Sequence, residues 1–279
     1  MPKKILCISP FSGELGWEIV NYIPYVNGIR RAHKFDLIFA CVRSGRERLY
    51  SFANRFMLTN LEDDVKVSGN FGPMNKYRNR IQVSFENRVG KMRGRGWECT
   101  VSRNMTKHDR GMFPGRKFIC YKASKEEMGL CHTQYGEKYA VILVRTRRNG
   151  RGKNWPIANF DRLGTAVESF GFTPVYVGSG SKHKFSCGIN LLGGTTVSDV
   201  IPILCGASFA VGGSTGTLHL AAMCKTPHFV WGNKRLVRRY KKDWNPFDTK
   251  VHFLKDYSWK PPVKSVVSGI KNFVDEVQS

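Results

Sequence analysis

Runs of apolar residues alternate with segments of helical spacing along the first part of the chain. Ile5 to Ser9 and Phe35 to Val42 are continuous apolar runs, which are typical of strands buried on both faces. Apolar residues recur at helical spacing from Ile19 to Ile29, between these two runs. We expect a further helix around Arg46 to Met57 and a strand at Asp64 to Val67. Strand–helix–strand order with continuous apolar strands predicts a parallel, doubly wound sheet.

The same alternation returns in the second half of the chain. Tyr139 to Val144 and Thr173 to Gly178 are expected strands, and Trp155-Pro156 opens a helix between them, with proline in its first turn. Thr196-x-x-Asp199 resembles a capping box, which predicts the start of the next helix. The remaining expected elements are a strand at Phe209–Val211, a helix at Leu218–Met223, a strand at His228–Trp231 and a last helix after Pro261-Pro262.

The stretch from about 69 to 117 lacks a clear apolar period. Basic residues alternate there with glycine and aromatic residues, so we expect long loops or partly ordered segments, a basic insert in the first domain. The whole pattern predicts an α/β fold of two facing Rossmann-like domains with a cleft between them. We place an N-terminal domain at 1–137, a C-terminal domain at 138–260 and a terminal helix at 261–279.

The charge balance points to a polyanionic partner. Lys and Arg number 45 against 21 Asp and Glu, which gives a net charge of +24 and a pI near 10.0. A fold does not need this excess, so nucleic acid or an anionic membrane face is the expected partner, and a basic surface that serves only solubility is the alternative.

The chain carries no pattern of a secreted or membrane-spanning protein. Its N-terminal apolar run is shorter than the core of a signal peptide, and no stretch approaches the length of a membrane span. The eight cysteines form no Cys-x-x-Cys pair, so we expect reduced core residues in a cytoplasmic protein.

The segment from Val211 to His219 has the pattern of a phosphate-binding turn. It runs from a strand through Gly212-Gly213-Ser214-Thr215-Gly216 into a helix. Such a turn directs backbone N–H groups at one point, at the positive end of a helix dipole, and its hydroxyls add donors. A purely steric role for the glycines is the alternative. His219 lies in the first helical turn, where it either faces the phosphates or has a structural role.

Three segments of the second half resemble glycosyltransferase family 9, the bacterial heptosyltransferases. They are Asn190-Leu-Leu-Gly-Gly-Thr-Thr, Phe209-Ala-Val-Gly-Gly-Ser-Thr-Gly-Thr-Leu-His and Pro227-His-Phe-Val-Trp-Gly. Upstream, a strand, a small polar loop and Lys153-Asn-Trp-Pro repeat the donor-side signature of that family. The resemblance covers about residues 139–235 and implies a GT-B glycosyltransferase. One departure is Ser214, which stands where the family usually has aspartate.

The resemblance implies a set of donor-binding residues. Lys153, Arg145 and Thr146 would contact the donor diphosphate together with Gly213, Ser214, Thr215, Gly216 and His219. As the glycosidic bond breaks, these cations and N–H donors would stabilise the charge on the leaving diphosphate. Trp155 and Trp231 are candidates for contact with the donor nucleotide or sugar, and for Trp155 a core position is equally expected. We find no Asp-x-Asp metal motif and expect no metal or cofactor, with a nucleotide-sugar, by analogy a UDP-sugar, as co-substrate.

A general base is expected in the loop after the first strand. A carboxylate there would accept the proton of the attacking hydroxyl. The family carries a carboxylate six residues before a proline, and Glu18 lies six before Pro24, which makes Glu18 the better match and Glu14 the second. The alternative for Glu18 is that it complements a helix N-terminus. If the base is correct, the reaction is an inverting single displacement.

The acceptor is expected to be DNA. Lys76, Arg78, Arg80, Lys91, Arg93, Arg95 and Trp97 are the expected nucleic-acid contacts of the insert, because cations with interleaved aromatics suit a phosphate backbone and its bases. A compact enzyme of this kind is similar to phage enzymes that glycosylate hydroxymethylated pyrimidines, which would act in the host cytoplasm. Transfer to a lipid-linked or saccharide acceptor at a membrane surface is the first alternative. A non-catalytic nucleic-acid-binding module is the second.

Overall fold

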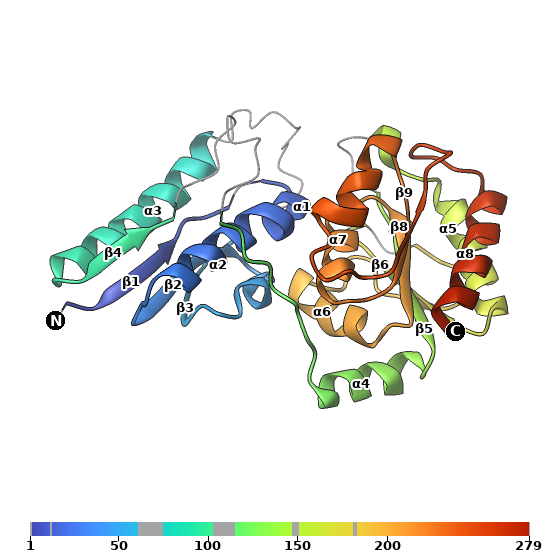
Figure 1. Cartoon of the computed structure of the whole chain (residues 1–279), viewed down its shortest axis with the longest axis horizontal. Coiled ribbons are helices and arrows are strands. Elements are labelled where there is room, and N and C mark those ends of the chain that lie inside the picture. The colour runs from blue at the N-terminus through green and yellow to red at the C-terminus, as the bar shows by residue number, and fades with distance from the viewer. Residues whose placement is uncertain are drawn as a thin grey trace. The chain divides into compact units, whose positions relative to one another are not determined.

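The chain forms two compact units, Met1–Ile119 and Cys120–Ser279. The computed structural model describes residues 2–11, 13–60, 75–102, 115–146, 151–180 and 183–278, and Figure 1 shows their arrangement within each unit. The sequence placed the boundary at 137. In the structure the second unit begins earlier, because helix α4 (Lys125–Tyr135) packs on helix α6 (Val197–Gly206). The N–H of Tyr121 also donates to the carbonyl of Met223 at 2.9 Å.

The first unit is built on a parallel sheet of four strands in the order β3-β2-β1-β4. These are β1 (Lys4–Ile8), β2 (Leu37–Arg43), β3 (Arg55–Thr59) and β4 (Glu98–Val101). After β1 the chain forms α1 (Leu15–Trp17), η1 (Glu18–Tyr22) and α2 (Ile23–Ala32) in direct succession. The helix expected at 46–57 is wrong. That stretch holds a short 3-10 turn, η2 (Glu47–Tyr50), and then β3, which pairs in parallel with β2.

The expectation of long loops across the insert is also wrong for the part that the structure describes. Helix α3 (Asn75–Gly94) and strand β4 occupy much of it, and β4 pairs with β1. Phe85 and Val89 on α3 are buried in the core of the sheet. Ile81 and Met92 pack against the same core. The insert therefore supplies part of the hydrophobic core and one edge strand of the sheet, while the strand expected at 64–67 lies outside the described residues.

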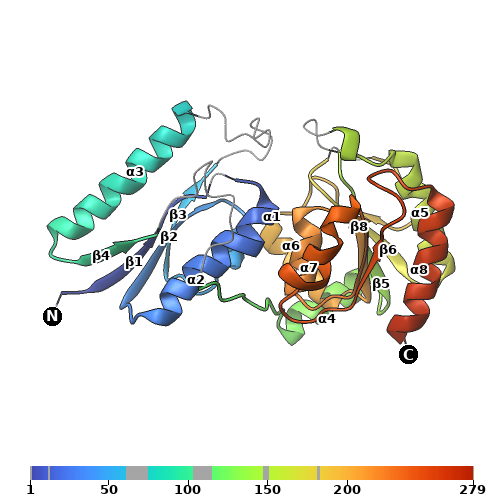
Figure 2. The same ribbon diagram turned by 45° about the horizontal axis from the view of Figure 1, so that its top comes forward.

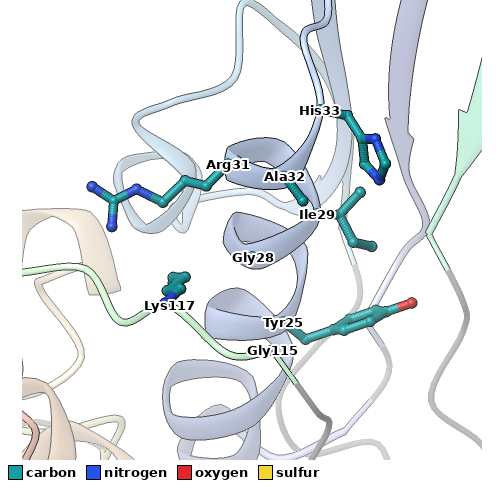
Figure 3. Close-up of a pocket in the computed structure, with 8 residues that line it drawn as sticks. All are labelled: Tyr25, Gly28, Ile29, Arg31, Ala32, His33, Gly115 and Lys117. Atoms are coloured by element: carbon teal, nitrogen blue, oxygen red, sulfur yellow. The ribbon is translucent and has the colours of Figure 1, made fainter.

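The chain that leaves the first unit lies along α2. Lys117 N–H donates to the carbonyl of Pro24 at 2.8 Å, and Asn27 Nδ2 donates to the carbonyl of Lys117 at 2.7 Å. Gly28 permits this close approach, since a Cβ there would lie 2.1 Å from the carbonyl oxygen of Gly115. A groove of about 390 Å³ remains beside this crossing. Figure 3 shows its lining residues: Tyr25, Gly28, Ile29, Arg31, Ala32, His33, Gly115 and Lys117.

The second unit has a parallel sheet of six strands in the order β10-β9-β8-β5-β6-β7. In chain order they are β5 (Tyr139–Leu143), β6 (Thr173–Val177), β7 (Ile189–Asn190), β8 (Phe209–Gly213), β9 (His228–Trp231) and β10 (Val251–Leu254). The strand order reverses between β5 and β8. In open α/β sheets, ligands bind outside the carboxyl ends of the strands at such a switch point.

Helices cover both faces of the six-stranded sheet. Helices α5 (Ile157–Ser169) and α8 (Val263–Gln278) cover one face, and α6 and α7 (Gly216–Met223) cover the other (Figures 1 and 2). Three short turns complete the unit: η3 (Arg151–Lys153), η4 (Lys234–Leu236) and η5 (Arg239–Asp243). The predicted capping box of α6 is confirmed, with Thr196 and Asp199 bonded reciprocally. All eight cysteines are free thiols. Among the described residues, no helix is both long and apolar enough to span a bilayer.

Candidate functional site

Two polar loops meet at the switch point of the six-stranded sheet. Leu143 at the end of β5 pairs in register with Gly212 near the end of β8. A Cβ at Gly212 would lie 2.9 Å from the Cβ of Leu143, so glycine allows the two strand ends to approach closely. Arg145 and Thr146 begin one residue after the end of β5, and the turn that begins at Ser214 follows β8. The sheet therefore brings together the two groups of residues that the sequence assigned to a diphosphate.

The turn after β8 leads into the N-terminus of α7. Thr215 is the N-cap residue, and its hydroxyl accepts a hydrogen bond from Leu218 N–H at 3.4 Å. The N–H of Ser214 donates to the carbonyl of Trp231 at 2.8 Å. The N–H groups of Gly216 and Thr217 belong to the first helical turn, which has no intrahelical acceptor. Together with the helix dipole, they give this turn the donors and the sign of potential that an anion requires.

Tyr240 completes the turn, and sequence reasoning missed it. Its hydroxyl lies 2.9 Å from the Ser214 Oγ and donates to it, while its ring is buried. Burial raises the pKa of Tyr240, so the phenol stays protonated and keeps this role as a donor. The hydroxyl hydrogen of Ser214 is then directed away from Tyr240 and can be donated to a ligand. No spacing rule connects residues 214 and 240, so only the fold reveals the pair.

The two cations expected at the diphosphate come from the loop between β5 and α5. Arg145 is partly buried, and its Nη1 donates to Oδ1 of Asn154. Lys153 is exposed, and its Nζ lies 4.7 Å from the centroid of the Trp259 ring. Thr146 is exposed beside Arg145. Within this loop, the structure describes neither 147–150 nor the side chain of Arg151.

Three of the expected donor contacts lie in the interior instead. His219 is 4% exposed, and its ring packs 4.5 Å from the rings of Tyr240 and Trp244. Burial, aided by the nearby His228 and Arg239, lowers the pKa of His219 to about 3, so the imidazole is neutral. Trp155 and Trp231 pack against each other in the core at 4.8 Å. For His219 and Trp155 these positions fit the structural alternatives, and all three side chains expose less than 5% of their surface.

The carboxylates of the first unit differ sharply in exposure. Glu14 is exposed and is the N-cap residue of α1. Glu18 is 1% exposed, forms an ion pair with Arg46, and accepts a hydrogen bond from Tyr50 Oη at 2.9 Å. A second buried arginine, Arg43, donates to the carbonyl of Gly13 at 3.3 Å. Arg43 at the end of β2 and Arg46 in the turn after it thus hold residues on both sides of Glu14.

The loop after β1 is also fixed to the end of β4. Ser9 N–H donates to Ser102 Oγ at 2.9 Å, and Ser9 Oγ donates to the carbonyl of Ser102 at 2.8 Å. The hydroxyl of Tyr22 donates to the carbonyl of Ser9 at 2.6 Å. All three residues are buried. This network joins the two strands between which the strand order of the first sheet reverses, which is where a ligand is expected in this fold.

The expected nucleic-acid contacts are spread over α3 and the turn after it. Arg80, Lys91, Arg93 and Arg95 are exposed. Lys76 and Arg78 lie on α3, and their side chains fall outside the described residues. Trp97 packs against the core below α3, with the Lys3 ammonium 5.8 Å from its ring centroid. The aromatic residue of this group therefore packs partly against the core and is only partly exposed.

Comparison with known proteins agrees with the donor-side resemblance. Residues 116–234 match the model of glycosyltransferase family 9 (heptosyltransferase). This range includes β5, β8, α7 and the two loops that meet at the switch point. Among curated proteins, none matches the sequence.

Solved structures with the same fold cover almost the whole chain. ADP-heptose LPS heptosyltransferase II of E. coli is 14% identical with a TM-score of 0.65, over 99% of this chain and 100% of its own. A family 9 glycosyltransferase of Veillonella parvula is 10% identical with a TM-score of 0.64, over 98% of each chain. Heptosyltransferase WaaC of E. coli, with ADP-2-deoxy-2-fluoro heptose, is 15% identical with a TM-score of 0.56, over 98% of this chain and 99% of its own. Together, the family match and the shared fold confirm the predicted GT-B architecture and the predicted class of enzyme, a glycosyltransferase.

Proposed function

We propose that this glycosyltransferase transfers a sugar from a nucleoside-diphosphate sugar to an acceptor hydroxyl, with inversion at the sugar carbon. The observation that carries the proposal is that the loop with Arg145 and Thr146 and the turn with Ser214 at the α7 N-terminus follow two neighbouring strands, β5 and β8, at one switch point. In the reaction, the acceptor oxygen forms a bond to the anomeric carbon as the bond from that carbon to the diphosphate breaks. The diphosphate leaves with an additional negative charge.

The donor side supplies stabilisation of that charge. The N–H groups at the start of α7 and the hydroxyl of Ser214 are fixed donors, because the N-cap and Tyr240 hold them in place. Arg145 is positioned by Asn154, and Lys153 lies on the same loop. WaaC was solved with ADP and with an ADP-sugar analogue, so ADP-sugars are the first donors to test, with the expected UDP-sugars as the second.

We assign the general base to Glu14, in place of the sequence's first choice, Glu18. A base must reach the hydroxyl of an incoming acceptor, and of these two carboxylates only Glu14 is exposed. The buried Arg46 and Tyr50 already occupy both carboxylate oxygens of Glu18. In this assignment Glu14 accepts the acceptor proton, and Glu18 is a positioning residue that fixes the loop after β1.

For the acceptor, we propose a saccharide hydroxyl, as in the heptosyltransferase-like alternative. The DNA hypothesis rested on an irregular basic insert with aromatics free to stack on bases. In the part of the insert that the structure describes, helix α3 and strand β4 stand in place of the expected irregular loops, and Trp97 packs partly against the core. The net charge of +24 then favours an acceptor that carries phosphate or carboxylate groups, or one presented on an anionic lipid surface.

One transfer assay tests both halves of the proposal. Radiolabelled ADP-heptose and UDP-glucose would be incubated with the full chain and each of three acceptors: a phosphorylated lipid-linked saccharide, DNA with hydroxymethylcytosine, and unmodified DNA. We expect label in the saccharide product. Label only in hydroxymethylated DNA would support the first sequence hypothesis instead. Binding of nucleic acid with neither transfer nor donor hydrolysis would favour the non-catalytic alternative.

A further inference from the structure

An aromatic side chain stands beside the phosphate-binding turn. Trp259 lies in the segment between β10 and α8 and is half-buried. A Cβ at Gly232, the residue directly after β9, would lie 3.3 Å from the Cβ of Ser214 and 3.5 Å from Cζ3 of Trp259. Ser214, Leu236 and Trp259 therefore all pack against the buried Gly232, which places the indole ring of Trp259 next to the phosphate-binding turn at the carboxyl edge of the sheet.

The segment that carries Trp259 is fixed to the core. Trp155 Nε1 donates to the carbonyl of Pro261 at 2.8 Å, and the Trp155 ring is buried against Trp231 and Phe160. Trp259 is thus held two residues from an anchored carbonyl. Its ring faces Lys153, whose Nζ lies 4.7 Å from the ring centroid. A cation and an aromatic face are therefore placed together beside the turn that would hold the diphosphate.

We propose that Trp259 is the platform on which the sugar ring of the donor packs. This inference rests on the proposed function, because it needs a diphosphate at Ser214 and the α7 N-terminus. The transferred sugar is joined directly to the terminal phosphate, so it has to lie next to that phosphate. Among the described residues, Trp259 offers a partly exposed aromatic face next to this turn. The C–H face of a pyranose is apolar and carries slight positive charge, which matches the negative face of an indole ring.

Lys153 covers the platform in the absence of donor. The attraction between its ammonium and the indole ring is modest at an exposed site, while a diphosphate offers full negative charge. When the donor binds, Lys153 moves from the ring to the phosphates and leaves the indole face free for the sugar. A free nucleoside diphosphate draws Lys153 away in the same manner but leaves the platform empty.

The experiment compares a nucleotide sugar, which would occupy the platform, with the free nucleotide, which would not. Isothermal titration of the full chain would compare ADP with ADP-heptose, and UDP with UDP-glucose. The variants are Trp259→Ala, Trp259→Phe and, as a matched control from the same segment, the exposed Tyr257→Ala. For Trp259→Ala we expect binding of the nucleotide sugar to weaken about tenfold, and binding of the free nucleotide to change less than about twofold. Trp259→Phe keeps an aromatic face and should retain most of the affinity, and Tyr257→Ala should match the wild type.

The outcomes separate this inference from the proposed function. If the wild-type chain binds neither nucleotides nor nucleotide sugars, the proposed function itself fails. If the wild type binds both and Trp259→Ala weakens both equally, the ring contacts the nucleoside or serves only the fold, and the platform is refuted. Unchanged affinity for both ligands in Trp259→Ala refutes it as well. Thermal unfolding of each variant shows whether the protein remained folded during the titrations.

Discussion

The buried pair of Glu18 and Arg46 allows a direct test of which carboxylate is the base. Their side chains are 2% and 3% exposed, so Glu18→Gln removes a carboxylate charge that is paired with the guanidinium of Arg46 in the interior. Loss of one partner of a buried pair costs about 3–5 kcal/mol of unfolding free energy. Tyr50→Phe removes one hydrogen bond to the carboxylate and should cost about 1.5–3 kcal/mol. Glu14→Gln changes an exposed side chain and should stay within about 0.5 kcal/mol.

Urea unfolding followed by circular dichroism, with transfer rates measured on the same preparations, gives both quantities. We expect Glu18→Gln to lower the unfolding midpoint strongly and Glu14→Gln to abolish transfer at unchanged stability. The double variant Glu18→Leu/Arg46→Met should recover part of the lost stability, because it removes both buried charges of the pair together. The reasoning is refuted if Glu18→Gln keeps the wild-type midpoint and loses transfer while Glu14→Gln remains active.

Three further predictions concern the stability of the two units. Burial lowers the pKa of His219 to about 3 and that of His228 to about 4, against about 6.5 in the unfolded chain. The unfolded state therefore binds more protons, and stability should fall as the pH drops from about 6.5 towards 4, by about 1.4 kcal/mol per pH unit for each histidine. Urea midpoints at several pH values check this, and a midpoint that does not change between pH 7 and 4 would contradict it. Phe85→Ala on α3 should cost about 3–5 kcal/mol, whereas Val83→Ala on the exposed side of the helix should cost far less. Equal unfolding free energies for these two variants would mean that α3 adds nothing to the core. Gly28→Ala should destabilise the first unit by about 1–3 kcal/mol, because its Cβ would overlap the Gly115 carbonyl. Gly90→Ala on α3, where the added Cβ meets nothing within 4 Å, is its control in the same thermal melts.

Sequence patterns predicted the elements whose apolar period is continuous. The strands β1, β2, β5, β6, β8 and β9 lie where apolar runs placed them. The helix α3 was missed because its buried stripe is narrow. Ile81, Phe85, Val89 and Met92 recur at helical spacing, but basic and polar residues fill the other positions. A search for one row of apolar residues at helical spacing, without regard to the mean hydropathy of the segment, would have found this helix.

The site was predictable to the extent that it is local in sequence. The turn from Gly213 to Gly216 could be identified because one strand–turn–helix segment contains it. Tyr240 and Trp259 reach the turn from distant segments, and no local pattern marks them. The sequence also could not show which of the two carboxylates is exposed, because Glu14 and Glu18 are four residues apart in similar contexts. The buried arginine and tyrosine that distinguish Glu18 come from residues 46 and 50.

The bonds between Ser9 and Ser102 have a consequence for the order of events as the chain folds. They join residues 93 positions apart, and the loop with Glu14 begins just after Ser9. A ribosome that has released only the first sixty residues has released β1, β2 and β3, but not the strand that fixes this loop. Contacts of such long range form late, because the closure of a large loop comes before any stabilisation from them. The loop therefore acquires its final shape only after β4 has been synthesised and paired, so a nascent or truncated chain can contain the carboxylate and still lack the geometry for transfer.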